Sequence, residues 1–198
     1  MNVYTVIVTG ASGSVYGLRL VERLLLAEHA VSLVTTDTGR DVVAYELDLR
    51  LPEEDAEAAV LDSLQLPRES RLRVVSSDDI FDPLASGSRK VDATIVIPAS
   101  MGFCGSLASG LASDLPERAA DVTLKEGRPL VVVPRETPLN LIHLRNLTTL
   151  AEAGARIVPA MPAFYHHPET IEDQVDFVVG KVLDVIGVEH DLFTRWGE

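Results

Sequence analysis

The chain has very little cysteine and no long apolar run. Its single cysteine, Cys104, excludes an internal disulfide framework and a cysteine metal cluster. No apolar segment approaches the ~20 residues that a membrane-spanning helix requires. The N-terminus leads directly into a strand-like run, without the basic segment and cleavage site of an export signal. From these absences we expect a cytoplasmic protein that does not contact a membrane.

Positive charge is scarce as well. The chain has 17 Lys and Arg residues against 30 Asp and Glu residues, which gives a formal net charge of −13. Such a field repels DNA, RNA and anionic lipid, so these partners are excluded. A phosphate-binding site would need a local positive pocket inside this acidic surface. The length of 198 residues, 46% of them hydrophobic, is enough for one compact domain, and we expect residues 1–198 to form it.

Apolar runs alternate with periodic segments along the chain. Continuous apolar runs predict strands at 4–9, 31–36, 72–76, 93–98, 130–134 and 156–159. The periodic segments predict helices at 16–29, 37–47, 53–64, near 105–112, at 139–153 and at 171–186. This alternation indicates parallel βαβ units, and therefore an α/β fold with a doubly wound parallel sheet.

Ligands of such sheets bind at the carboxyl ends of the strands, so the loops there are candidate sites. The first loop, 10–13 (GASG), consists of small residues that let the backbone approach a ligand closely. The helix after it offers free N–H groups and a positive dipole end to a phosphate, and the Ser12 hydroxyl adds a donor. A tight turn also needs glycine, so this loop alone leaves a flavin or nucleotide site and a simple turn equally open.

Two further loops follow buried strands. Small and hydroxyl residues fill 98–103 (PASMGF), which by themselves favour a turn with a helix cap. Arg135 and Glu136 stand together at the end of the next strand, where a charge is costly unless it is paired or used. Arg135 could bind a flavin or phosphate bidentately, and Glu136 could move a proton if burial raises its pKa. A structural ion pair explains the two residues equally well.

Other charged and aromatic residues are less specific. Arg118 and Lys125 are separated by seven residues, nearly two helical turns, so they share a face that suits an anion, although a solvated face is the commoner explanation. Tyr165 can donate to a phosphate oxygen. Trp196 could stabilise a carbocation with its ring, although packing is at least as common. From spacing alone, Glu46 is a surface helix acid.

We reject a metal site at the adjacent histidines, His166 and His167. Neighbouring histidines rarely share a metal, and no carboxylate-rich partner motif accompanies them. The residues therefore indicate no metal site.

Several motifs fall in order along nearly the whole chain. They are GASGSVYGLRL (10–20), the helix that carries Glu46, ASGS (85–88), IPASMG (97–102), RAADVTLKE (118–126), VPRETPL (133–139), PAFYHHPETIED (162–173) and the closing RW (195–196). The combination resembles the UbiX/Pad1 flavin prenyltransferases. The resemblance implies a flavodoxin-like Rossmann fold and a metal-independent transfer of the dimethylallyl group of dimethylallyl phosphate to N5 and C6 of reduced FMN. The product, prenylated FMN, serves UbiD-type decarboxylases.

The resemblance also assigns roles to individual residues. FMN would be bound by Gly10, Ala11, Ser12, Thr36, Ser100, Met101, Gly102, Phe103 and Arg135. Dimethylallyl phosphate would be bound by Arg118, Lys125, Arg135, Tyr165 and Lys181, with Trp196 beside it. The proton transfers would be served by Ser12, Glu46 and Glu136. The family often assembles as a homododecamer with sites at subunit interfaces, so a neighbouring chain would supply some of the phosphate ligands.

Four positions depart from the common family pattern. Thr36 stands where serine is usual, Ala99 replaces a frequent cysteine, and Phe103 replaces a frequent threonine. Lys181 stands where arginine is usual, which keeps the charge but loses the bidentate fork. None of these changes removes the expected chemistry.

Two alternatives stay open. A related FMN-dependent cysteine decarboxylase would want a histidine in the helix after the first strand and a cysteine-containing lid. Here that helix begins SVYGLRL, and Cys104 is alone. A flavin carrier without catalysis would tolerate loss of the dimethylallyl phosphate ligands, yet nearly all of them are present. A test for turnover and for its product separates these alternatives.

Overall fold

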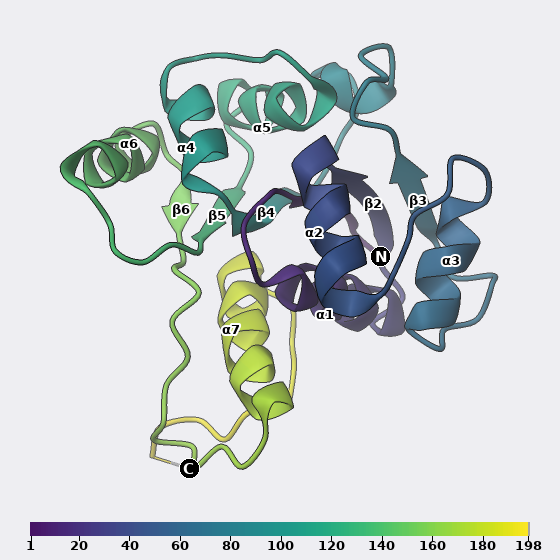
Figure 1. Ribbon diagram of the computed structural model, residues 1–198, viewed down its shortest axis with the longest axis vertical. Helices are drawn as coiled ribbons and strands as arrows, with labels where there is room; N and C mark the ends of the chain where they lie inside the picture. The colour runs from purple at the N-terminus through teal and green to yellow at the C-terminus, as the bar shows by residue number, and fades with distance from the viewer. Residues whose placement is uncertain (198) are drawn as a thin grey trace.

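A computed structural model describes residues 1–197 (Figure 1). Six strands form one sheet in the order β3-β2-β1-β4-β5-β6, and every neighbouring pair is parallel. They are β1 (Val3–Val8), β2 (Ala30–Thr35), β3 (Leu72–Val75), β4 (Ala93–Ala99), β5 (Leu130–Pro134) and β6 (Arg156–Ile157). This is the doubly wound order of a Rossmann-type sheet, with its topological switch point between β1 and β4. The predicted fold class is confirmed.

Helices cover both faces of the sheet. They are α1 (Ser14–Leu26), α2 (Asp37–Leu47), α3 (Ala56–Ser63), α4 (Met101–Ala108), α5 (Leu115–Lys125), α6 (Leu141–Glu152) and α7 (Ile171–Ile186), with a short 3₁₀ helix, η1 (Pro83–Ala85). One core forms where α1, α2, α3 and α7 pack on the sheet, and a second forms under α4, α5 and α6 (Figure 1). Over the residues that the structure describes, no helix is long and apolar enough to cross a membrane.

Successive side chains of the central strands point alternately into these two cores. In β1, Val6 and Val8 point into the core under α1, whereas Ile7 points into the core under α4 and α5. In β4, Ile95 and Val96 divide in the same way, and all five of these side chains are fully buried. Both faces of a central strand are therefore apolar, which is why these strands were readable as continuous apolar runs.

The helix predicted near 105–112 is misplaced. In the structure α4 covers Met101–Ala108. Its N-cap is Ser100, whose Oγ accepts a hydrogen bond from the N–H of Phe103 over 3.2 Å. This serine cap starts the helix directly after β4, so the loop between them is a single residue. By contrast, the predicted bounds of α2 and α7 agree with the structure, and α7 ends where Gly187 takes a φ of 73°.

Candidate active site

The buried threonine Thr9 joins the loops that follow β1 and β4. Its Oγ1 donates to the carbonyl oxygen of Pro98 over 2.7 Å and accepts from the N–H of Ser100, also over 2.7 Å. The hydroxyl thus fixes the 10–13 loop beside the start of α4, at the switch point of the sheet. Sequence reading missed this residue, because nothing distinguishes it from an ordinary threonine at a strand end.

Two positions of the first loop require glycine, each for a different structural reason. A Cβ on Gly10 would lie 2.5 Å from Oγ1 of Thr38, so α2 approaches too closely for any side chain there. Gly13 has a φ of 107°, a left-handed conformation that favours glycine. The loop between them, with Ala11 and Ser12, is consequently held in one shape at the carboxyl end of β1.

Glu46 caps the N-terminus of α1. Its carboxylate accepts hydrogen bonds from the N–H of Gly13 over 3.0 Å and from the N–H of Ser14 over 2.9 Å. The expectation that these N–H groups are free for a phosphate is therefore wrong. Burial acts to raise the pKa of Glu46, but hydrogen bonds from the Ser12 side chain and from these N–H groups outweigh it and lower the pKa. Two predicted catalytic residues, Ser12 and Glu46, are thus in direct contact, with Glu46 held as an anion.

Arg135 reaches the same loop from the far side of β4. Its Nε donates to the carbonyl oxygen of Ser12 over 2.9 Å. Tyr16 lies close by: burial raises the pKa of its phenol, and the positive charge of Arg135 acts to lower it. Among the described residues, no ion pair joins Arg135 to Glu136. The outer edge of the guanidinium therefore remains available for a flavin or an anion.

Glu136 is exposed in the isolated chain, so the burial that the sequence hypothesis required is not provided by this chain alone. Its Oε1 accepts a hydrogen bond from the N–H of Thr137 over 2.9 Å. The side chain lies next to Arg135 in the sequence, at the carboxyl end of β5. It is placed at the correct edge of the sheet for the expected proton transfer, with solvent in contact with its carboxylate.

Thr36 and Ser100 are N-caps of two helices that begin at this edge of the sheet. Oγ1 of Thr36 accepts from the N–H of Gly39 over 3.0 Å, as Ser100 does for α4. Both helix N-termini carry partial positive charge. Met101 and Phe103 have buried side chains in the core under α4, whereas Gly102 is exposed. Small residues, capping hydroxyls and helix N-termini together fit a flavin nucleotide.

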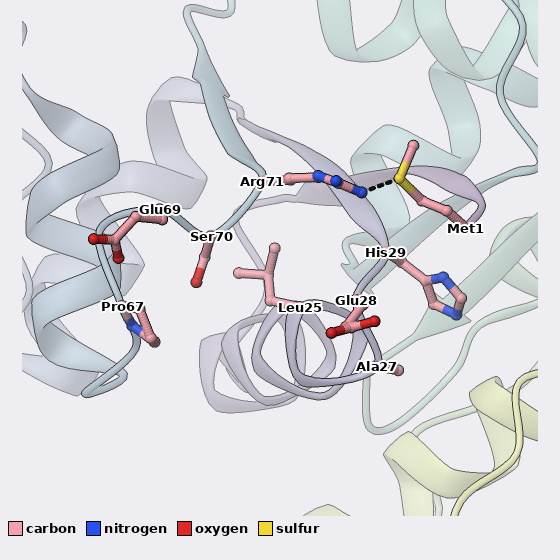
Figure 2. A pocket seen from close by; sticks show the side chains of 9 residues that line it. All are labelled: Met1, Leu25, Ala27, Glu28, His29, Pro67, Glu69, Ser70 and Arg71. Carbon is pink, nitrogen blue, oxygen red and sulfur yellow. Dashed lines mark hydrogen bonds between the residues drawn. The ribbon is translucent and has the colours of Figure 1, made fainter.

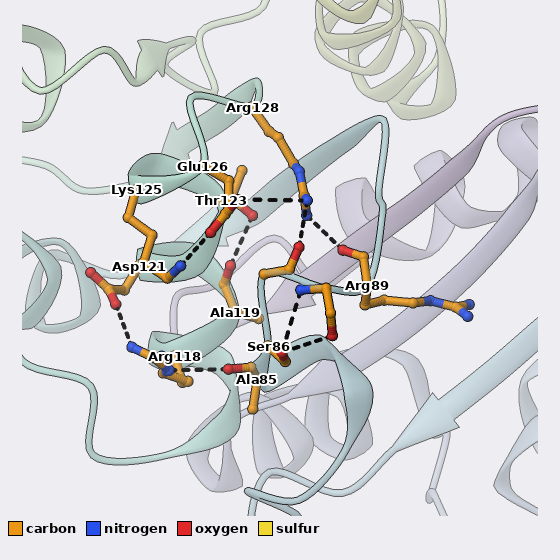
Figure 3. A network of polar contacts seen from close by, with 12 residues as sticks. Ala85, Ser86, Arg89, Arg118, Ala119, Asp121, Thr123, Lys125, Glu126 and Arg128 are labelled. Carbon is orange, nitrogen blue, oxygen red and sulfur yellow. Dashed lines mark hydrogen bonds and ion pairs between the residues drawn. The ribbon is translucent and has the colours of Figure 1, made fainter.

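Arg118 and Lys125 lie on α5, as their spacing predicted, and each is paired with an acid (Figure 3). Arg118 binds Asp121 over 2.8 Å and donates from Nε to the carbonyl oxygen of Ala85 over 3.2 Å. Nζ of Lys125 contacts the carboxylate of Glu126. The 85–88 loop (ASGS) packs against this helix, so two of the motifs meet here.

Tyr165, Lys181 and Trp196 lie in the C-terminal part of the chain. The rings of Tyr165 and Trp196 meet edge to face, with centroids 5.1 Å apart. Nζ of Lys181 lies 3.3 Å from a carboxylate oxygen of Asp184. The ring of His166 stacks on Phe177 with centroids 5.1 Å apart, which is a packing role.

The predicted site residues therefore form three groups: the sheet-edge loops with Arg135, the α5 cations, and the C-terminal residues. Across residues 1–197, no hydrogen bond, ion pair or ring contact links one group to another. The N–H of Leu115 bonds to Ser77, just after β3, whereas Lys125 ends α5 five residues before β5 begins at Leu130. Lys125 thus lies toward the amino edge of the sheet, away from Arg135.

Two pockets mark opposite edges of the sheet. One of about 450 Å³ is lined by residues that include Leu25, His29 and Arg71, at the amino ends of β2 and β3 (Figure 2). None of the predicted site residues lines it, so we do not assign it to the reaction. Another, of about 270 Å³, includes Thr35 and Asp37 and lies at the carboxyl ends of β2 and β3, next to Thr36.

The fold and the sheet-edge loops define a class of flavin-binding proteins. Residues 2–183 match the family model described as Flavoprotein. The chain is 48% identical over 197 residues to the flavin prenyltransferase UbiX of Halalkalibacterium halodurans, an alignment that covers 100% of this chain and 94% of the relative. The chain belongs to the UbiX flavin prenyltransferase family, and the resemblance found in its motifs is confirmed.

Solved structures agree with this assignment. The structure of AnUbiX (PadA1), in complex with FMN and dimethylallyl pyrophosphate, superposes with a TM-score of 0.88 at 36% identity, covering 100% of this chain and 98% of that one. A dodecameric FMN-dependent UbiX-like decarboxylase from Escherichia coli O157:H7 superposes with a TM-score of 0.85 at 37% identity and covers all of both chains.

Proposed function

We propose that this chain transfers the dimethylallyl group of dimethylallyl phosphate to reduced FMN, with bonds formed at N5 and C6 of the flavin. The observation that carries the proposal is the chain of contacts from Glu46 through Ser12 to Arg135, at the switch point of a sheet that belongs to this family. Residues 1–198 would act as one flavoprotein domain.

FMN would lie across the carboxyl ends of β1, β4 and β5. Its binding groups would come from Gly10, Ala11, Ser12, Thr36, Ser100, Met101, Gly102, Phe103 and Arg135. Thr9 supports this proposal, because its two hydrogen bonds hold the 10–13 loop in a fixed position beside the segment that begins at Ser100. The guanidinium of Arg135 is tied at Nε and would use its outer N–H groups on the flavin.

The leaving group would be stabilised by cations. Breaking the allylic C–O bond concentrates negative charge on the departing phosphate, and fixed positive groups stabilise that transition state. Arg118, Lys125, Arg135 and Lys181 would supply the charge, with Tyr165 as a hydroxyl donor and Trp196 beside the allyl group. A monophosphate leaving group stabilised in this way does not require a metal ion.

Bond formation at C6 releases a proton, which needs an acceptor. Glu136 is a better candidate for this acceptor than Glu46. The pKa of Glu46 is lowered, so the Glu46 carboxylate is a weak base. Glu46 would instead hold the Ser12 hydroxyl and the start of α1 in place beside the flavin. Ser12 would then relay the proton or orient the reacting edge of the ring.

The site would be completed by a second copy of the chain. Lys125 lies toward the amino edge of the sheet, away from Arg135 of the same chain, and a neighbour's α5 would bring the charges of Lys125 and Arg118 to the phosphate. The dodecameric relative from Escherichia coli supports a homo-oligomer, and we propose a homododecamer. The product would pass to a UbiD-type decarboxylase in the cytoplasm, without nucleic acid or membrane as a partner.

Release of inorganic phosphate tests the proposed function. The protein is mixed anaerobically with dimethylallyl phosphate and a metal chelator, with and without reduced FMN. We expect phosphate release only when reduced FMN is present. Release without flavin would indicate a simple phosphatase. FMN binding with no release would support the flavin carrier. A cysteine decarboxylase is disfavoured, because Cys104 is fully buried within α4 and so cannot belong to a lid over the site.

A further inference from the structure

The carboxylate of Asp184 on α7 binds several basic side chains near the C-terminus. Nη2 and Nη1 of Arg195 lie 2.8 and 3.3 Å from its two oxygens, and Nζ of Lys181 lies 3.3 Å from Oδ2. Nε2 of His190 lies 3.2 Å from Oδ1. Three partners from two segments of the chain therefore share one carboxylate.

The course of the backbone brings these side chains to Asp184. Gly187 ends α7 with a φ of 73°, and the chain then turns back along the helix. A Cβ on Gly180 would lie 2.7 Å from the His190 ring and 2.5 Å from the Phe193 ring, so the returning segment packs directly on the helix surface. The side chain of His190 is only 2% exposed, which makes this contact part of the core.

Asp184 thereby connects residues that the proposed reaction uses. Lys181 stands one turn before it on α7, and Arg195 directly precedes Trp196, whose ring packs on Tyr165. Burial acts to raise the pKa of Asp184, but the hydrogen bonds from Arg195 and Lys181 lower it, so the carboxylate stays charged. Lys181 and Arg195 thus both bind this one carboxylate.

We propose that Asp184 is a positioning residue for dimethylallyl phosphate. It holds the Lys181 ammonium toward the phosphate, and through Arg195 it clamps the C-terminal segment so that Trp196 stays against Tyr165. This inference rests on the proposed function and deepens it, because it names the group that organises the C-terminal half of the donor site. Asp184 acts through these side chains and does not contact the reacting atoms.

The first test separates substrate binding from turnover. In Asp184→Asn the charge is removed while the size is kept, and we expect the KM for dimethylallyl phosphate to rise on the order of tenfold with FMN affinity unchanged. Asp176→Asn is the matched control. Asp176 lies on the same helix and binds Arg19 of α1 at 2.7 and 2.9 Å, so its loss weakens an ion pair away from Lys181.

The second test uses Trp196, the sole tryptophan of the chain, and does not require activity. If Asp184 clamps the C-terminal segment, Asp184→Asn lowers the fluorescence anisotropy of Trp196, whereas Asp176→Asn leaves it unchanged. A wild-type protein that does not turn over would defeat the proposed function, yet this readout would still decide whether the clamp exists.

Two results would overturn the inference. One is Asp184→Asn matching Asp176→Asn in both KM and anisotropy, which would reduce Asp184 to an ordinary stabilising residue. The other is a loosened Trp196 with an unchanged KM, which would show that the clamp has no part in substrate positioning. The triple variant, Asp184→Asn with Lys181→Gln and Arg195→Gln, should have the same KM as Lys181→Gln with Arg195→Gln if Asp184 acts only through these two cations.

Discussion

The Nε of Arg135 donates a hydrogen bond to the carbonyl oxygen of Ser12 over 2.9 Å. The strands that precede these two residues are not neighbours, because β4 lies between β1 and β5 in the sheet. The arginine therefore spans the switch point and ties two loops that are 123 residues apart in the sequence. Together with the hydrogen bonds of Thr9 and Glu46, this contact sets the geometry of the proposed flavin site.

Replacing Arg135 by lysine tests that geometry. Lysine keeps the charge but loses both the Nε donor and the planar fork, so we expect FMN to bind about tenfold more weakly, or about 1.4 kcal/mol. Titration of flavin fluorescence measures the change. Arg50→Lys is the control, since Arg50 is exposed in the connection after α2. Equal FMN affinity in the two variants would contradict a role for Arg135 in flavin binding.

Glu46 should stabilise the fold in a pH-dependent manner. Its pKa is lowered in the folded chain, so its contribution is present above its ordinary pKa of 4.5 and is lost as the pH falls through the lower folded value. Loss of the cap in Glu46→Gln should cost about 0.5–1 kcal/mol near neutral pH, a fall of roughly 1–4 °C in Tm.

The pH profile of Tm measures this contribution. Wild type and Glu46→Gln should differ by a constant amount from neutral pH down to about pH 5, and should converge in stronger acid. Glu54→Gln, in the connection before α3, serves as the control. A difference that persisted in strong acid would mean that the charge of Glu46 is not what stabilises α1.

Glu136 is expected to act on the chemical step. Glu136→Gln keeps the shape of the side chain but removes its basicity, so FMN should bind as in wild type while turnover falls on the order of a hundredfold. Stopped-flow absorbance of the reduced flavin, under single-turnover conditions, measures the step directly. Unchanged turnover would sink the assignment and leave Ser12 with Glu46 as the route for the proton.

Subunit complementation tests whether α5 serves a neighbouring chain. Arg118→Gln and Arg135→Gln chains should each be nearly inactive as pure oligomers. When they are co-expressed and form mixed oligomers, some sites combine an intact Arg135 from one chain with an intact Arg118 from another, so activity should return. Mixed oligomers as inactive as the pure ones would show that both arginines must come from the same chain.

The strands and most helices were predictable because burial on both faces makes a central strand such as β4 continuously apolar. The start of α4 was not, because one capping hydroxyl, Ser100, decides it and a hydroxyl in a Gly- and Ser-rich stretch has many possible roles. Glu46 looked like a surface acid because helical periodicity gives its face but not its partner, and its partners Gly13 and Ser14 lie over 30 residues away in the sequence.

The motifs predicted the residues of the candidate site, but they did not predict that these residues fall into three separate groups within one chain. Sequence order could not place Lys125 away from Arg135, since that separation depends on the direction in which α5 crosses the sheet. Asp184 offered one local signal, its position three residues after Lys181. Its other partners, His190 and Arg195, contact Asp184 only because the chain reverses at Gly187.

The mass of the flavin after reaction is the most direct test of the proposed function. The purified protein is mixed anaerobically with reduced FMN and dimethylallyl phosphate, without metal, and the flavin is analysed by mass spectrometry. We predict a flavin heavier by one five-carbon dimethylallyl unit. An unmodified flavin, recovered from a protein that binds both FMN and dimethylallyl phosphate, would contradict the account.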